Sequence, residues 1–413
     1  MELVRELRTL TAPDGSEYQF GEPEGIFVKD DGTMYVADAL NGQVVLCTDR
    51  GELLSILPTP ESSLLPDNFI YKPSKVVVDS NDRVYIQSND LFQGLVYLDE
   101  NGDFIKFFGA NEVEMTFKRQ ILKLWKTLLS DKAAGTLQDF NPIEYSNIFL
   151  SPDGYVYGTA AATENTSSAD GYQMRTNAFT AKSKSKMVVK LNPLGVESLP
   201  FRLYAAGALY SDVTVDENGI MTVLDRMNGK LCQYNASGTQ LFTFGGTGAQ
   251  AGLFQDAVSL IEIRGDLYVM DALKNTITEF SLTEFGALVL EAINLYDAGL
   301  YQQCMEPWRE VIRRNGNYQL AYSGLGKAYY QIKDYETSMY YFKLANDRSG
   351  YSDAFREVSL HQMRNSFGWI VLAVAVVLTA VALWRRFRRQ GRTPLKLPGW
   401  RKGADYERSQ RGR

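Results

Sequence analysis

The sequence predicts an all-β propeller over its first two thirds, followed by an α-helical array and one membrane-spanning helix. Three observations predict this order. A hairpin pattern recurs five times, the hydrophobic period changes from 2 to 3.6 after Gly286, and an uncharged apolar run lies near the C-terminus. We therefore expect a β-propeller at 1–281, helices at 286–365, a membrane span at 367–384 and a basic tail at 385–413.

The repeat reads as an apolar strand, a turn rich in Asp, Asn and Gly, and a second apolar strand. Turn residues of these types adopt left-handed or Asx geometry, which closes a β-hairpin. Each copy continues into a third and a fourth strand, and four short strands repeated every 45–50 residues or so are typical of propeller blades. The copies are GIFVKDDGTMYVAD (25–38), KVVVDSNDRVYIQS (75–88), NIFLSPDGYVYGTA (147–160), DVTVDENGIMTVLD (212–225) and the looser VSLIEIRGDLYVMD (258–271).

Two insertions lengthen the spacing between copies. Residues 110–140 contain a helix-like run with Trp125 and Lys126, and residues 160–186 form a polar Ser/Thr/Ala segment. Long insertions on a propeller usually lie on one face and carry binding residues, so Trp125 and Lys126 are candidates for contact with a partner. A helix against a blade edge beside a disordered loop remains an equal alternative.

The segment from Pro23 to Asn41 carries the pattern P-x-G-I-x-V-x-x-D-G-x-x-Y-V-A-D-x-x-N, and VLDRMNGKL and VMDALKNTI repeat its second half. This pattern resembles the NHL-repeat propellers over residues 1–281. The family's signature histidine is absent, and Gln43 and Lys230 fall near its place. The resemblance implies a propeller of repeated four-stranded blades.

The first hairpin signal, LRTLTAPDGSEYQFG (7–21), reads as the second half of a blade and has no inner pair before it. A closed ring hides its edges, whereas an isolated half-blade exposes them. We therefore expect six blades in the complete protein, with a signal peptide and at least a half-blade ahead of Met1. The opening residues MELVRELRTL lack the apolar core of a signal peptide.

The helical region contains two units that match at 34 residues, AINLYDAGLYQQCMEPWREVI (292–312) and GKAYYQIKDYETSMYYFKLAN (326–346). Their small residues and paired aromatics resemble tetratricopeptide repeats. Two readings stay open. The array is either a rigid spacer or a peptide-binding groove, and Tyr296, Trp308 and Tyr330 are the binding candidates.

The apolar run FGWIVLAVAVVLTAVALW is long enough to cross about one hydrocarbon core, since 18 helical residues span roughly 27 Å. Trp369 and Trp384 lie where interfacial aromatics anchor a span, and the basic block starts at Arg385 and Arg386. Basic flanks collect in the cytoplasm, so we expect a single-pass cell-membrane protein with an extracytoplasmic N-terminal domain. A cytosolic, tail-anchored scaffold is the alternative.

Charge and rare residues exclude several functions. The net charge of −6 divides into +9 for residues 385–413 and −15 for the rest, so the basic tail fits a membrane flank and we expect no nucleic-acid partner. The lone His361 excludes histidine triads and multi-histidine metal sites. Three scattered cysteines fit neither a zinc motif nor a disulfide framework. We expect no cofactor.

The channel mouth, where the innermost strands start, offers one candidate metal set. Glu24, Asn147 and Asp212 supply oxygen ligands that suit calcium, and calcium-dependent lactonases of propeller fold use a comparable cluster. Lys75 at the same rim opposes a cation. A lactonase-like hydrolase is therefore the alternative to a protein without enzymatic activity. We expect Asp38, Asp225 and Asp271, which share one repeat position, to cap turns.

The whole layout resembles a group of surface proteins from Gram-positive bacteria, on stretches such as LLPDNFIYKPSKVVVD (64–79) and YFKLANDRSGYSDAF (341–355). That resemblance implies a place beside sugar-importing ABC transporters and a small Yip-like membrane protein. Propellers and helical repeats both present broad rigid faces. We therefore expect a binding or scaffold protein whose partner is a protein, a transporter component or a cell-wall glycan.

Overall fold

The computed structural model describes residues 6–390, except 63–64, 66–68, 90, 92, 110–143, 162–187, 202 and 204–206. The insertion candidates Trp125 and Lys126 and most of the basic tail therefore lie outside the described residues. The chain divides into two compact units, residues 1–287 and 288–413, and each is described by itself.

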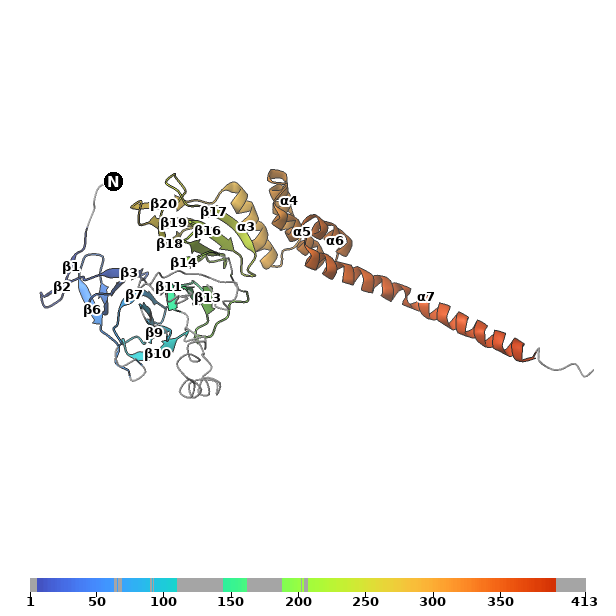
Figure 1. The fold of residues 1–413 in the computed structure, drawn as a ribbon, viewed down its shortest axis with the longest axis horizontal. Helices are drawn as coiled ribbons and strands as arrows, with labels where there is room; N and C mark the ends of the chain where they lie inside the picture. The colour runs from blue at the N-terminus through green and yellow to red at the C-terminus, as the bar shows by residue number, and fades with distance from the viewer. Residues whose placement is uncertain are drawn as a thin grey trace, which may run out of the picture. The chain divides into compact units, whose positions relative to one another are not determined.

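The first unit is a five-bladed β-propeller built from antiparallel sheets (Figure 1). In every blade the strands follow one another in chain order from the first strand outward, as expected for the repeat. The first blade is β3 (Pro23–Val28), β4 (Met34–Asp38), β5 (Gln43–Cys47) and β6 (Leu53–Leu57). The second is β7 (Pro73–Val78), β8 (Val84–Ser88), β9 (Leu95–Leu98) and β10 (Phe104–Phe108).

The remaining blades keep the same order. The third has three described strands, β11 (Glu144–Leu150), β12 (Val156–Ala161) and β13 (Val188–Leu191). The fourth is β14 (Tyr210–Val215), β15 (Met221–Asp225), β16 (Lys230–Tyr234) and β17 (Gln240–Gly245). The fifth also has three described strands, β18 (Ala257–Ile263), β19 (Asp266–Asp271) and β20 (Thr276–Phe280). All five predicted hairpins are thus the first two strands of blades.

Neighbouring blades pack on one another through apolar side chains, and the second blade does so on both faces of its sheet. The hairpin β7–β8 shows how. Val76 and Ile86 lie in a cluster with Tyr35 of the first blade, whereas Val77 and Tyr85 lie in a cluster with Ile148 of the third. Strands buried on both faces read as continuous apolar runs, which is why KVVV and VYI occur here.

The N-terminal strands β1 (Thr9–Thr11) and β2 (Glu17–Gln19) form a two-stranded hairpin, as the sequence predicts for a half-blade. Leu10 is fully buried in a cluster with Val36, Val45 and Cys47 of the first blade. The hairpin leads directly into β3, as the outer strands of one blade lead into the next. It therefore occupies the outer half of a blade position beside the first blade.

The second unit is helical, with α3 (Glu284–Asp297) starting in the first unit and α4 (Met305–Arg314), α5 (Gln319–Gln331), α6 (Tyr335–Leu344) and α7 (Arg348–Gln390) following it. Glycines let aromatic rings approach the helix backbones. A Cβ on Gly324 of α5 would lie 2.5 Å from the Trp308 ring of α4, and one on Gly326 would lie 2.7 Å from the Phe342 ring of α6. These contacts hold the helices together in sequence order.

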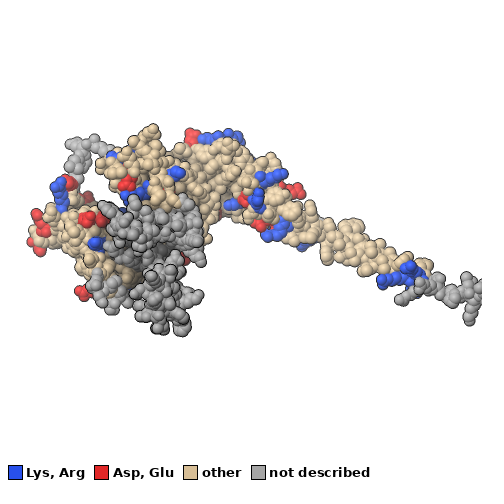
Figure 2. Space-filling model, in the orientation of Figure 1, with Lys and Arg blue, Asp and Glu red and all other residues tan. Residues whose placement is uncertain are grey.

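The C-terminal helix α7 contains one segment, Ser366–Arg388, that is long and apolar enough to cross a membrane. Its 23 residues span about 35 Å, slightly more than a typical hydrocarbon core. None of the segment is buried inside the protein, and Figure 2 shows an uncharged stretch of this helix that ends in basic side chains. An exposed apolar surface of this size is typical of a membrane or interaction site. The apolar C-terminal helix predicted from the sequence is therefore present.

Candidate functional site

All five first strands carry an irregularity at the same place, near their start. The ladder between the first and second strands shifts register between Pro23 and Gly25, and again at the equivalent positions of the other four blades. Bulges of this kind bend a strand and re-aim a side chain, and they are enriched beside active sites. The mouth predicted from the sequence is therefore a repeated structural feature, and its side chains decide what it can do.

Glu24 lies at the first of these bulges and is exposed. Its carboxylate accepts a hydrogen bond from the Asn89 side chain of the second blade at 3.2 Å. Behind it, a Cβ on Gly25 would lie 2.4 Å from the Ser74 carbonyl oxygen, so the first two blades approach each other closely here. Glu24 thus joins neighbouring blades and retains free oxygen capacity.

Asn147 and Asp212 lie one residue after the bulge in the third and fourth blades, at the place of Gly25 in the first, and both are buried. Each side chain turns back on its own strand. Asn147 Oδ1 accepts from the Ile148 amide, and Asp212 Oδ1 accepts from the Val213 amide, both at 2.8 Å. Because Asn147 Oδ1 and Asp212 Oδ1 already accept hydrogen bonds from these amides, they are less available to coordinate a cation.

The second oxygen of Asp212 reaches the fifth blade. It accepts from the Leu260 amide at 2.7 Å and from the Ser259 hydroxyl at 3.1 Å. Burial raises the pKa of Asp212 to about 6, although these donors and the charge of Lys75 act in the opposite direction. The positive charge of Lys75 therefore favours the ionised form of the same carboxylate that the calcium hypothesis assigns as a ligand.

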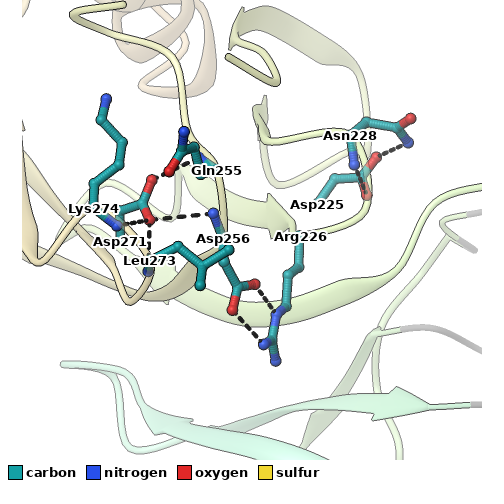
Figure 3. A network of polar contacts seen from close by, with 8 residues as sticks. All are labelled: Asp225, Arg226, Asn228, Gln255, Asp256, Asp271, Leu273 and Lys274. Carbon is teal, nitrogen blue, oxygen red and sulfur yellow. Dashed lines mark hydrogen bonds and ion pairs between the residues drawn. The ribbon is translucent and has the colours of Figure 1, made fainter. Parts of the chain in front are cut away.

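The recurring aspartates cap turns, as predicted (Figure 3). Asp271 accepts backbone N–H bonds from Gln255, Asp256, Leu273 and Lys274 at 2.7–3.2 Å. Burial alone would raise the pKa of Asp271, but these donors outweigh it and lower the pKa. A carboxylate with this many amide donors is committed to holding the start of the first strand against the end of the second.

The same arrangement recurs at Asp225 and Asp38. Asp225 accepts from the Leu209 amide at 3.0 Å and from the Asn228 side chain at 2.7 Å. Asp38 accepts from the Glu22 amide at 2.8 Å. In the second blade the place is taken by Ser88, whose hydroxyl accepts from the Lys72 amide at 3.0 Å. The repeated aspartate is therefore structural wherever it occurs.

One ion pair joins two blades beside this network and was not predicted. The Arg226 guanidinium donates to the Asp256 carboxylate from Nε at 2.6 Å and from Nη2 at 2.8 Å (Figure 3). Asp256 directly follows Gln255, whose amide donates to Asp271, so the pair lies against the turn that starts the fifth blade. A two-pronged contact of this kind fixes orientation as well as distance.

Within the part of the chain that the structure describes, no group of three or more His, Cys, Asp or Glu side chains could hold a metal ion. Glu24, Asn147 and Asp212 are each engaged separately, by Asn89 in the first case and by backbone amides in the other two. The three cysteines are free and buried. The described mouth therefore offers hydrogen-bonding groups at its rim rather than a ready set of ligands.

The aromatic candidates of the helical region separate by burial. Trp308 is 2% exposed and packs on Gly324, so it belongs to the helical core. Tyr296 and Tyr330 are half-buried, and each packs edge to face on a second tyrosine, Tyr301 and Tyr335 respectively. Of the three binding candidates in the helical region, Tyr296 and Tyr330 are therefore the accessible ones.

The anchor candidates all lie on α7. Trp369 is 74% exposed and Trp384 is 57% exposed. Arg385 and Arg386 follow on the same helix, and the Arg388 guanidinium lies 4.9 Å from the Trp384 ring centre. Aromatic and basic side chains at a helix end are the groups that interact with lipid headgroups.

No family model and no curated protein matches this sequence. Solved structures that resemble it include virginiamycin B lyase from Staphylococcus aureus, at 15% identity over 64% of this chain and 72% of that one, with a TM-score of 0.36. A chain of the nidogen–laminin complex is 12% identical over 64% of this chain and 80% of that one, with a TM-score of 0.40. A putative gluconolactonase is 14% identical over 64% of this chain and 79% of that one, with a TM-score of 0.38. Likeness this low carries no argument about function.

Proposed function

We propose that this protein is a membrane-anchored scaffold whose propeller and tetratricopeptide-like helices bind a partner outside the cytoplasm. The observation that carries the proposal is that the recurring aspartates of the propeller serve its structure. The carboxylate oxygens of the three recurring aspartates accept hydrogen bonds from backbone amides at the turns that join the strands. What remains accessible is a set of broad strand and helix faces, which suits binding.

The anchor supports a location at a membrane. Residues 366–388 form one apolar segment of α7, and basic residues gather at its end from Arg385 onward. In the proposed orientation these basic residues lie in the cytoplasm and the propeller lies outside, because short cytoplasmic flanks collect Lys and Arg. A propeller held there would meet cell-wall glycan, exported proteins and the outer parts of transporters.

The proposed partner is a protein component of a carbohydrate ABC transporter, in line with the resemblance of the layout to Gram-positive surface proteins. A scaffold for such a machine needs a rigid body and a fixed attachment rather than a catalytic centre. The half-buried pairs Tyr296–Tyr301 and Tyr330–Tyr335 are the proposed contact residues of the helical region, since tyrosine is enriched in protein interfaces.

Cross-linking in intact cells tests the proposal. The full chain is tagged at its C-terminus, cross-linked with a membrane-impermeant reagent and purified in detergent, and the attached proteins are identified by mass spectrometry. We expect a defined membrane protein whose yield falls at least fivefold in a Tyr296→Ala, Tyr330→Ala double variant. The exposed Tyr340→Ala variant is the matched control. Recovery of no specific protein, or equal recovery from both variants, would count against the helical contact.

A further inference from the structure

The helix α7 continues past the hydrophobic part of its apolar segment. It runs without a break from Arg348 to Gln390, so Arg385, Arg386 and Arg388 lie on a helix rather than on a loop. A helix fixes which side chains share a face, because residues three and four positions apart are neighbours. The basic end of the anchor is therefore an ordered surface.

One face of this end carries apolar, aromatic and basic side chains in that order. Its last member, Arg388, lies four residues beyond Trp384 and three beyond Arg385, and two valines precede them at the same helical spacing. We call this face the headgroup row. Its members are Val377, Val381, Trp384, Arg385 and Arg388, and all five are exposed.

The headgroup row has the length of one lipid leaflet. At roughly 1.5 Å per residue it rises about 16 Å from Val377 to Arg388. The hydrocarbon layer of one leaflet is about 15 Å deep, which is half of a core about 30 Å thick. With Arg388 at the level of the headgroups, Val377 lies near the middle of the bilayer. The row therefore faces one lipid molecule along its whole length.

The two arginines of the row are arranged to receive a phosphate. The Arg388 guanidinium lies 4.9 Å from the Trp384 ring centre, and this contact orients the group without using its N–H donors. Arg385 is its neighbour on the helix surface. Arginine binds phosphate oxygens through two parallel N–H bonds, so a pair of adjacent guanidinium groups suits a single phosphate.

No acidic side chain offsets these charges. The sequence contains no Asp or Glu between Glu357 and Asp405. Among the ion pairs of the described residues, none involves Arg385, Arg386 or Arg388. The positive charge at this end of α7 therefore needs a counter-charge from outside the chain.

We propose that the headgroup row binds an anionic phospholipid, with the lipid phosphate on Arg385 and Arg388 and an acyl chain along Val377 and Val381. Figure 2 shows the basic side chains at this end of α7, directly after the uncharged stretch. Basic clusters next to a membrane span attract anionic lipids. Arg386, on the neighbouring face of the helix, adds to the attraction.

The chemistry of the row favours a lipid over other anions. A nucleic acid, an acidic peptide or free phosphate would engage the arginines but would leave the valines uncovered. A phospholipid covers both parts, because its phosphate is joined to its acyl chains. The charge of the row selects the anionic class, since the choline of a zwitterionic lipid offsets the charge of its phosphate.

This inference goes beyond the proposed scaffold function and depends only on its membrane anchor. The full chain is placed in nanodiscs of phosphatidylglycerol and phosphatidylcholine in equal amounts and moved into mild detergent. Native mass spectrometry then counts the lipids that the protein retains. We expect phosphatidylglycerol to exceed phosphatidylcholine by about fivefold or more, a preference that millimolar inorganic phosphate leaves unchanged.

Variants locate the site. The Arg385→Gln, Arg388→Gln double variant should bring the preference below about twofold. Trp384→Leu keeps both charges but frees the Arg388 guanidinium, so it should lower the preference by about half. The matched control is the Arg348→Gln, Arg356→Gln double variant, which removes the same charge from exposed positions of α7 ahead of the apolar segment. It should retain lipids as the wild type does.

The other outcomes would overturn the proposal in distinct ways. Equal preferences in the two double variants would show that the headgroup row is not the site. Release of the lipid by millimolar phosphate, or its replacement by an RNA oligonucleotide, would identify a different ligand. A chain that enters nanodiscs but retains both lipids equally removes this inference and leaves the anchor standing. A chain that does not enter nanodiscs at all removes both.

Discussion

The Tyr18 hydroxyl donates a 2.7 Å hydrogen bond to the Asp38 carboxylate, and this contact ties the hairpin β1–β2 to the second strand of the first blade. The same hydroxyl accepts from the Gln43 side chain at 2.8 Å. Gln43 falls near the place of the family's signature histidine. Here it supports a link between neighbouring sheets.

Removal of the Asp38 carboxylate should destabilise the propeller. Asp38→Ala leaves the Gly21 and Glu22 amides without their acceptor, so we expect a loss of about 2–4 kcal/mol in the free energy of unfolding. Tyr18→Phe should cost about 1 kcal/mol, since it removes one bond. Urea denaturation measures both. Asp30→Ala, at an exposed position, is the control, and an equal loss there would contradict the capping role.

The carboxylates of Glu262 and Asp38 should make the stability of the folded protein depend on pH in opposite directions. Burial, together with Asp216 and Glu217, raises the pKa of Glu262 to about 7 from an ordinary value of 4.5. The folded protein then binds more protons than the unfolded chain between these values, so this contribution to stability falls as pH rises from about 4.5 to 7. The lowered pKa of Asp38 works the other way, and its contribution is lost as pH falls.

Glu262→Gln should therefore raise the melting temperature at pH 8 by about 2–4 °C and leave it nearly unchanged at pH 4.5. Thermal unfolding followed by circular dichroism at the two pH values checks this. Glu100→Gln, an exposed position, provides the matched control. A gain that is equal at both pH values would show that charge on Glu262 is not its cause.

The glycine contacts of the helical unit should be intolerant of a methyl group. Gly324→Ala places a Cβ 2.5 Å from the Trp308 ring, so we expect a loss of about 1–3 kcal/mol and separation of α4 from α5. Gly316→Ala, whose Cβ would meet no atom closer than 3.8 Å, should change stability by less than about 0.5 kcal/mol. Hydrogen exchange of the α4 and α5 amides measures the difference.

Calcium discriminates the scaffold from the lactonase-like alternative. Asp212 already accepts bonds from the Val213 and Leu260 amides, so added calcium has to displace them. We expect millimolar calcium, or its removal with a chelator, to move the melting temperature by less than about 1 °C. A larger stabilisation that Asp212→Ala abolishes would favour the hydrolase. The control is Asp153→Ala, an exposed carboxylate on the third blade.

Much of the propeller was predictable because its signals are local. The short apolar run in MYVAD and the turn residues in DDGT indicate a hairpin without reference to the rest of the chain. The aspartate caps were predictable for the same reason, since Asp271 accepts from the Leu273 and Lys274 amides of the turn that directly follows it. The repetition of this hairpin five times along the chain then predicted the propeller fold.

The candidate site was harder to predict because it depends on contacts between blades. Nothing near Asp212 in the sequence indicates that Ser259 and Leu260 donate to it, and nothing near Arg226 indicates Asp256. The burial of Trp308 depends in the same way on Gly324 of the next helix. Exposure of Ile26 follows from what its sheet faces, which no local pattern encodes.

The side of the membrane on which the propeller lies tests the proposed function most directly. A maleimide that cannot cross membranes can report it, because the three native cysteines are buried. Glu100→Cys marks the propeller and Ser409→Cys marks the basic tail. In intact cells we expect labelling of Glu100→Cys alone, with Ser409→Cys labelled only after permeabilisation. Labelling of Ser409→Cys but not Glu100→Cys, or protection of both, would contradict an extracytoplasmic scaffold.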